Sequence, residues 1–188
     1  MGRNGIDFGE WDKEFDLFSW MDELPRILSK NGAGVIFNDW KNIGEMAKYC
    51  EGLGLIVKDM IVWRKSNPMP RNRDRRYITD YECAFWFTMP KAKWVFNRLD
   101  KAYQRPQFTF PVVESKNRFH PTQKPVKLME ELLKIHTNEN DVVLDCFMGS
   151  GTTGEACIYT NRKFVGFELD ENYFNIANER IYRHLSYN

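Results

Sequence analysis

The strongest constraint on the fold of this chain is a glycine-rich turn at residues 149–154. It follows the apolar run Asp141–Leu144, which suits a buried strand, and it overlaps the start of Gly154–Ile158, which has helix-forming character. Gly149 and Gly151 stand at the hinge, where glycine permits a tight turn and lets the backbone approach a ligand without an obstructing Cβ. A strand, this turn and a helix, in that order, predict a site for an adenosine-bearing cofactor.

Two cofactor classes satisfy the turn. It matches the dinucleotide pattern G-x-G-x-x-G, and Glu168 ends the next predicted strand 19 positions after Gly149, where a carboxylate can accept ribose hydroxyls. The turn alone is therefore also compatible with an NAD-dependent oxidoreductase. Asp145 favours S-adenosylmethionine, because a carboxylate at the strand end accepts from the ammonium of a methionine moiety and repels a pyrophosphate.

Length and composition predict one domain, residues 1–188. The 188 residues are 43% hydrophobic and 15% aromatic, which is enough to bury one sizeable core. No run of about 18 apolar residues predicts a membrane span, and the N-terminal residues lack the apolar core of a signal peptide. We therefore expect a cytoplasmic protein with no membrane partner.

The four cysteines, Cys50, Cys83, Cys146 and Cys157, lie far apart in apolar or mixed segments. They form no paired spacing of the kind that binds a metal, so we assign no metal site and expect these thiols to be reduced and buried.

Charge is distributed unevenly along the chain, although the net charge is only +1. Residues 1–57 carry a net −4, residues 58–127 a net +10 and residues 128–188 a net −5. A strongly basic segment between acidic ones is typical of a polyanion-binding surface, because lysines and arginines that neutralise phosphates release counterions. A solvated charged surface is the alternative.

Strands and helices are predicted to alternate. Helices are expected at 20–28, 42–52, 126–136, 153–160 and 171–184, the first starting late because Pro25 fits best in a first turn. Strands are expected at 33–37, 55–63, 81–89, 141–144 and 163–168. This alternation favours an α/β fold with a mostly parallel sheet and helices on both faces. Residues 64–76 and 90–119 are predicted to be loops, which at the carboxyl ends of strands form the ligand crevice.

Several motifs in order resemble the amino-methyltransferases of bacterial and phage DNA. His120–Pro125 (His-Pro-Thr-Gln-Lys-Pro) leads into a predicted helix, and Asp145–Gly154 and then Gly166–Asp170 follow it. Trp63–Pro70 is similar to the family's tryptophan, lysine, Asn-Pro-x-Pro element. The order is that of the permuted, beta class, in which the cofactor motifs follow the catalytic ones. Cys146 stands where the family usually has proline.

This resemblance implies a Rossmann-like methyltransferase fold and a function in restriction-modification. The implied reaction is site-specific transfer of a methyl group from S-adenosylmethionine to an exocyclic base amine of DNA, with adenine favoured over cytosine. The residues that the resemblance places around the cofactor are His120, Thr122, Lys124, Asp145, Phe147, Gly149, Ser150, Gly151, Thr152 and Glu168.

The segment from Trp63 to Arg76, called the basic segment from here on, is the predicted DNA contact. It holds six basic residues and one acidic residue, and arginine is well matched to phosphates and guanine edges. The predicted DNA-binding residues are Trp63, Arg64, Lys65, Asn67, Arg71, Arg73, Arg75 and Arg76. By the resemblance, residues 71–119 form a target-recognition insertion. A flipped target base needs an aromatic face, for which Trp40, Trp63 and Tyr77 are candidates; a charged surface loop is the alternative for the segment.

The family's catalytic motif, an acidic or polar residue followed by Pro-Pro and an aromatic, does not occur in this sequence, since none of the eight prolines are adjacent. We therefore assign no catalytic residue and expect the chain alone to be inactive. The motif is expected just upstream of Met1, because residues 2–12 resemble the loop that follows it. In the family its strand lies beside the one ending at Asp145, so one central strand is expected to be missing. A second copy or an N-terminal segment would supply it; an inactive DNA- and cofactor-binding subunit is the alternative.

Overall fold

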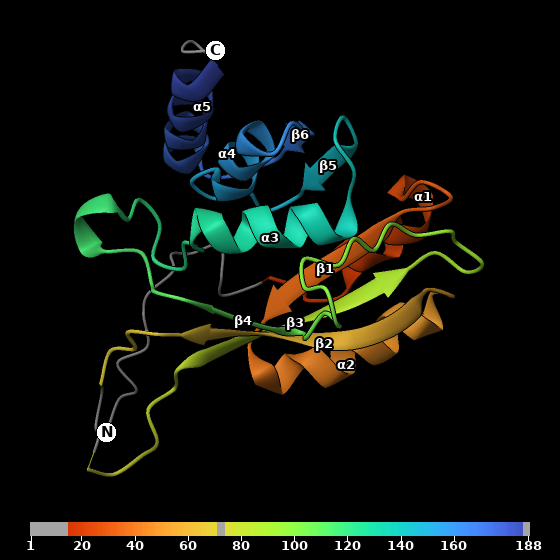
Figure 1. The fold of residues 1–188 in the computed structure, drawn as a ribbon, viewed down its shortest axis with the longest axis horizontal. Helices are drawn as coiled ribbons and strands as arrows, with labels where there is room; N and C mark the ends of the chain where they lie inside the picture. The colour runs from red at the N-terminus through yellow and green to blue at the C-terminus, as the bar shows by residue number, and fades with distance from the viewer. Residues whose placement is uncertain (1–14, 71–73, 186–188) are drawn as a thin grey trace.

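The computed structural model describes residues 15–70 and 74–185, and its strands form two sheets (Figure 1). The four-stranded sheet has the order β1 (Ala33–Asn38), β3 (Tyr81–Thr88), β2 (Ile56–Lys65) and β4 (Gln107–Phe110). The two-stranded sheet pairs β5 (Val142–Asp145) with β6 (Lys163–Gly166). The helical elements are η2 (Ser19–Glu23), α1 (Leu24–Ile27), α2 (Trp40–Gly52), η3 (Ser115–Asn117), α3 (Val126–His136), α4 (Thr152–Tyr159) and α5 (Glu171–Leu185).

The predicted α/β class is confirmed, but the larger sheet is mixed. Strand β3 runs antiparallel to both β1 and β2, whereas β4 is parallel to β2 and β6 is parallel to β5. Parallel neighbours need a long crossover, usually helical, whereas antiparallel neighbours need only a return loop. The described residues between β2 and β3, 66–70 and 74–80, contain no helix, and β3 accordingly returns antiparallel.

Helices cover both faces of the four-stranded sheet, as predicted (Figure 1). Asp39 caps α2 by accepting from the Lys41 amide, and the apolar side of this helix packs on one face. The residues of that core are Met21, Leu24, Ile43, Met46, Cys50, Leu55, Cys83, Phe85 and Phe87. Helix α3 packs on the other face, in a core of Ile61, Trp63, Ala84, Phe108, Leu128, Leu132 and Ile135.

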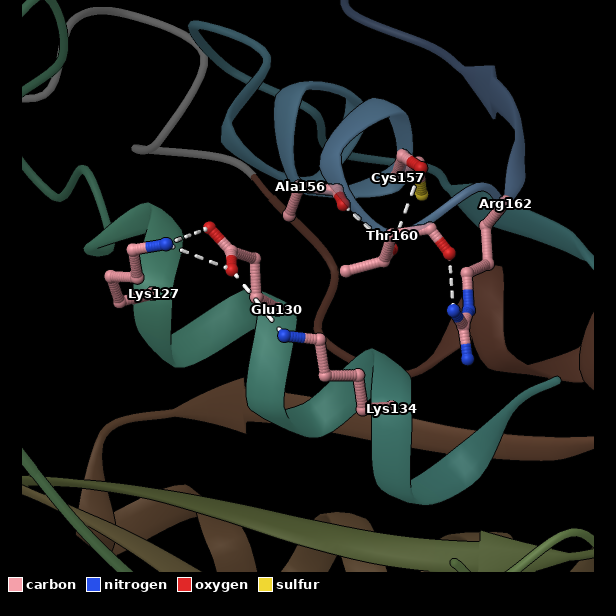
Figure 2. Close-up of polar contacts among 7 residues, drawn as sticks. All are labelled: Lys127, Glu130, Lys134, Ala156, Cys157, Thr160 and Arg162. Carbon is pink, nitrogen blue, oxygen red and sulfur yellow. Dashed lines mark hydrogen bonds and ion pairs between the residues drawn. The ribbon is translucent and has the colours of Figure 1, made fainter. Parts of the chain in front are cut away.

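Helix α3 also supports the smaller sheet, because the side of α3 that faces away from the larger sheet packs on α4. Leu133 is buried there with Ala156 and Cys157. Glu130, whose side chain is only 6% exposed, is held between Lys127 and Lys134 on its own helix (Figure 2). Beyond α4, Arg162 donates to the Thr160 carbonyl (Figure 2) and to the Thr137 carbonyl after α3. One helix therefore fixes the position of both sheets.

Two elements depart from the predicted pattern. Strand β4 and η3 lie within residues 90–119, which the sequence predicts to be loops. The Trp63 indole donates to the Phe110 carbonyl at 3.0 Å and holds β4 beside β2. The first helix starts late, as predicted, because α1 begins at Leu24 with Pro25 in its first turn.

The carboxyl ends of β1, β2 and β4 point the same way, because β1 and β2 are both antiparallel to β3. The loops that leave β2 and β4 extend beyond this end of the sheet (Figure 1). Within 15–70 and 74–185, no helix is long and apolar enough to cross a membrane.

Candidate cofactor site and nucleic-acid interface

Asp145 ends β5 and is held rigidly at the mouth of the glycine-rich turn. Its carboxylate accepts from the Phe147 amide at 3.0 Å and from the Thr153 hydroxyl at 2.5 Å. Desolvation raises the pKa of Asp145, and these two hydrogen bonds offset part of the rise. A cationic group at this position would favour the charged carboxylate, so the site is electrostatically suited to an ammonium.

The turn itself requires glycine at two positions. Gly149 and Gly151 have φ angles of +51° and +81°, in the left-handed region. A Cβ at Gly151 would lie 2.9 Å from the Ala177 Cβ on α5. Because Gly151 also precedes the first residue of α4, the turn can bring the N-terminus of α4 and the flank of α5 close together.

Glu168 reaches the turn from the neighbouring strand. The parallel register pairs Asp145 with Gly166, so both carboxylates lie at the carboxyl ends of adjacent strands. Glu168 accepts from the Gly149 amide at 2.8 Å and from the Asp170 amide at 3.0 Å. A carboxylate offers about four acceptor positions, so capacity remains for ligand hydroxyls.

The segment His120–Pro125 lies against the turn. The ring of His120 is 3.6 Å from where a Cβ of Gly149 would be, and 4.4 Å between centroids from the ring of Tyr173. Its Nδ1 is 3.1 Å from the Thr122 hydroxyl, and desolvation lowers its pKa. Lys124 donates to the Thr122 carbonyl at 3.1 Å, and its charge lowers the pKa of both Asp145 and His120. These groups therefore form one polar site.

Arg180 on α5 is a site residue that sequence reasoning missed. It donates to the Ser150 carbonyl at 2.5 Å and to the Ser150 hydroxyl at 3.0 Å, and it pairs with Glu155 at 2.5 Å. The Ser150 hydroxyl also donates to Gln123, which in turn accepts from the Phe119 amide. Arg180 thus links the turn to α5, and Gln123 links the turn to the segment before α3.

The remaining predicted cofactor residues flank the turn. Phe147 is 50% exposed and makes edge-on contacts with Phe15 and Trp20, with ring centroids 5.5 and 5.0 Å apart. Thr152 is buried at the first position of α4. The ten predicted cofactor residues therefore lie on the turn, at the ends of β5 and β6, or in the segment packed against it.

The predicted DNA-binding residues differ in burial and in their contacts. Trp63 is only 1% exposed and lies in the core, so it supports β4 and has no face free for DNA in this structure. Asn67 accepts from the Val112 amide at 2.7 Å and joins the two loops beyond β2 and β4. Lys65 is partly buried and pairs with Glu82 at 3.0 Å.

The three described arginines of the set are exposed, as Asn67 is. Arg64 pairs with Asp80 at 3.3 Å while its side chain is 70% exposed, and Arg75 and Arg76 are exposed in the return loop. Arg71 and Arg73 lie outside the described residues. Of the aromatic candidates for the base, Trp40 is 58% exposed and Tyr77 is 97% exposed, whereas Trp63 is excluded by its burial.

The thiols are all free; Cys50, Cys83 and Cys157 are buried as predicted, and Cys146 is partly buried. In the part of the chain that the structure describes, no group of three or more histidine, cysteine or acidic side chains could hold a metal ion.

A model of the N6/N4 methyltransferase family, described as DNA methylase, matches residues 4–179. The chain belongs to this family. It is 30% identical over 200 residues to the type II methyltransferase M.HinfI of Haemophilus influenzae, covering 95% of this chain and 55% of the relative. It is 29% identical over 195 residues to the type II methyltransferase M2.DpnII of Streptococcus pneumoniae, covering 94% and 72% respectively. The chain thus spans about half the length of the first relative.

Solved structures share the fold of this chain. The structure matches M1.HpyAVI in complex with SAM at a TM-score of 0.83 and 46% identity, over 90% of this chain and 84% of that chain. The PvuII methyltransferase, specific for cytosine N4, matches at a TM-score of 0.73 and 19% identity, over 86% and 67%, which supports the fold alone. The predicted methyltransferase fold is therefore confirmed.

Proposed function

We propose that this chain is the cofactor- and DNA-binding part of a DNA amino-methyltransferase. The reaction would transfer a methyl group from S-adenosylmethionine to an exocyclic base amine, with adenine the favoured target. The observation that carries the proposal is the convergence of Asp145, Glu168 and the His120–Pro125 segment on the glycine-rich turn, in a chain of the DNA methylase family.

The donor set fits S-adenosylmethionine, which also lies in the solved complex of M1.HpyAVI. In this assignment Asp145 accepts from the ammonium and Glu168 from the ribose hydroxyls, while Phe147 offers an exposed ring beside the turn. When bound, the cofactor supplies an activated methyl group. The protein residues hold it in one orientation, which favours transfer by proximity.

The proposed DNA surface is the exposed part of the basic segment. Arg64, Arg75 and Arg76 would contact phosphates or base edges. Strands β3 and β4 lie within the proposed recognition range 71–119. The described loops left for recognition are therefore 74–80, 89–106 and 111–119.

We further propose that these 188 residues do not methylate DNA by themselves, because no Pro-Pro catalytic motif is present. The separation of the two sheets supports this proposal. Among the described strands, no backbone hydrogen bonds join the two sheets, although α3 packs between them. A strand between them, supplied by another segment or a second copy, would bring the catalytic residues beside Asp145.

Calorimetry with S-adenosylhomocysteine and with NAD tests the cofactor assignment. We expect binding of the former, weakened at least tenfold by Glu168→Ala, which removes the proposed ribose acceptor. Glu171→Ala, an exposed glutamate three residues along the chain, is the matched control and should bind normally. Tight binding of NAD alone would refute the proposed cofactor. An unchanged affinity for S-adenosylhomocysteine in Glu168→Ala would refute the proposed ribose contact of Glu168.

Methyl transfer is tested separately with tritiated S-adenosylmethionine and mixed-sequence duplex DNA. We expect no incorporation into DNA by the 188 residues alone. Clear incorporation would show that the catalytic group lies within this chain.

A further inference from the structure

Glu82 on β3 stands between the two proposed binding regions. One carboxylate oxygen is 3.0 Å from the Lys65 ammonium, and the other is 3.0 Å from the Lys124 ammonium. Lys65 belongs to the basic segment Trp63–Arg76, and Lys124 belongs to the segment packed on the glycine-rich turn. No other residue among those described forms ion pairs with both of these segments.

The three side chains are sheltered, unlike the surface ion pairs of this protein. Their exposed fractions are 30% for Glu82, 19% for Lys65 and 21% for Lys124. Desolvation would raise the pKa of Glu82, but the two lysines outweigh it and lower the pKa below the ordinary value. The carboxylate is therefore charged at neutral pH and neutralises one of two positive charges that would otherwise repel each other.

The position of Lys124 bears directly on Asp145. The Lys124 charge already lowers the pKa of Asp145. A Lys124 released from Glu82 would gain most by moving toward this second carboxylate, because opposite charges attract strongly in a sheltered site. There it would compete with the cationic end of a ligand.

We infer that Glu82 is a positioning residue that holds Lys124 away from Asp145 and fixes Lys65 in its place within the basic segment, so that the cofactor site stays open. The inference rests on the proposed function. It assigns Glu82 no contact with cofactor or DNA, only the placement of two residues that flank them.

Glu82→Gln tests this with an outcome that simple destabilisation does not give. The substitution keeps the shape and removes the charge, so we expect the Kd for S-adenosylhomocysteine to rise at least fivefold. DNA affinity, measured by anisotropy with a labelled duplex, should be unchanged or higher, because a negative charge near the basic segment is gone. Glu114→Gln, which removes the exposed partner of Lys116, is the control and should leave the cofactor affinity unchanged.

The dependence on Lys124 is the decisive readout. In a Lys124→Met background, Glu82→Gln should change the Kd for S-adenosylhomocysteine by less than twofold, because the competing cation is absent. An unaltered cofactor affinity in Glu82→Gln, an equal effect in both backgrounds, or a parallel loss of cofactor and DNA binding would each overturn the inference. Failure of the unmodified chain to bind either ligand would instead refute the proposed function.

If Glu82→Gln does not fold, Lys65→Met tests the same arrangement. Among the described lysines, Glu82 would then keep Lys124 as its partner, so cofactor affinity should stay within twofold while DNA affinity falls. Loss of cofactor affinity in Lys65→Met would overturn the inference.

Discussion

The ion pair of Arg180 at the glycine-rich turn is enclosed, whereas the ion pair of Arg64 in the basic segment lies at the surface. At the turn, Arg180 and Glu155 form an enclosed pair with side-chain exposures of 11% and 13%. In the basic segment, Arg64 pairs with Asp80 while remaining 70% exposed. A small ligand needs donors and acceptors fixed in advance, whereas a polyanion can be met by long side chains that stay in water. The two regions therefore match two different ligands.

This comparison predicts its largest effect at Arg180. Arg180→Met removes an enclosed ion pair and two hydrogen bonds to Ser150, and it leaves Glu155 without this partner. Breaking such a pair costs about 3 to 5 kcal/mol of unfolding free energy. Urea denaturation followed by circular dichroism measures it.

Arg183→Met on the same helix is the matched control. Its pair with Glu179 is more than 70% exposed on both sides, so the loss should be below about 0.5 kcal/mol. Equal costs for the two variants would contradict the contrast between enclosed and exposed charge.

A second test concerns a sheltered group that is kept neutral. His136, at the end of α3, lies 4.9 Å between ring centroids from Trp86, and its Nδ1 has no hydrogen-bond partner among the described residues. Desolvation lowers the pKa of His136 from 6.5 to about 4. The unfolded chain therefore binds the proton first, and stability falls as the pH drops from 6.5 to about 4, by roughly 3 kcal/mol in total.

His136→Phe keeps the aromatic packing and removes this titration. We expect the difference in unfolding free energy between wild type and variant to change across that pH window and to be flat above pH 7. Urea denaturation at several pH values measures the difference, which cancels the contribution of the carboxylates. A constant difference from pH 7 to pH 4 would show that the pKa of His136 is the same in the folded and unfolded states.

The turn geometry gives a third, smaller effect. Gly151→Ala forces a side chain into the left-handed region and against Ala177, so we expect a loss of about 2 kcal/mol. Gly44→Ala on α2 meets no atom within 4 Å and should instead stabilise by up to about 1 kcal/mol, because alanine favours a helix. Thermal unfolding of both variants gives the sign; a neutral Gly151→Ala would show that the turn relaxes.

Much of the fold was predictable because its signals are local. The bounds of α3, Val126–His136, follow from its apolar periodicity and Pro125, and the late start of α1 follows from Pro25. Strand β4 was not predictable, because its four residues between two prolines become a strand only through contacts with β2 and Trp63. The antiparallel direction of β3 could not be predicted either, because its residue pattern is the same for either direction.

The candidate site divides in the same way. Asp145, Glu168 and the glycines stand in contiguous motifs, so their types and spacing predict them. Arg180 acts on Ser150 from thirty residues away, and Glu82 lies in an aromatic strand that resembles a core element. Such residues are found only when packing brings distant segments together. Packing also decides the role of Trp63. It belongs to a recognisable motif, but it is buried and holds β4 beside β2.

The smallest expected effects belong to the exposed arginines. Arg75→Gln and Arg76→Gln should each weaken duplex DNA binding about threefold at moderate salt, and each should lower the slope of log affinity against log salt by about 1. Arg183→Gln removes another exposed arginine, on α5, and should leave that slope unchanged. Anisotropy titrations at four salt concentrations distinguish these cases. If all three variants lose the same slope, DNA is attracted by net charge alone, and the basic segment has no special role in binding it.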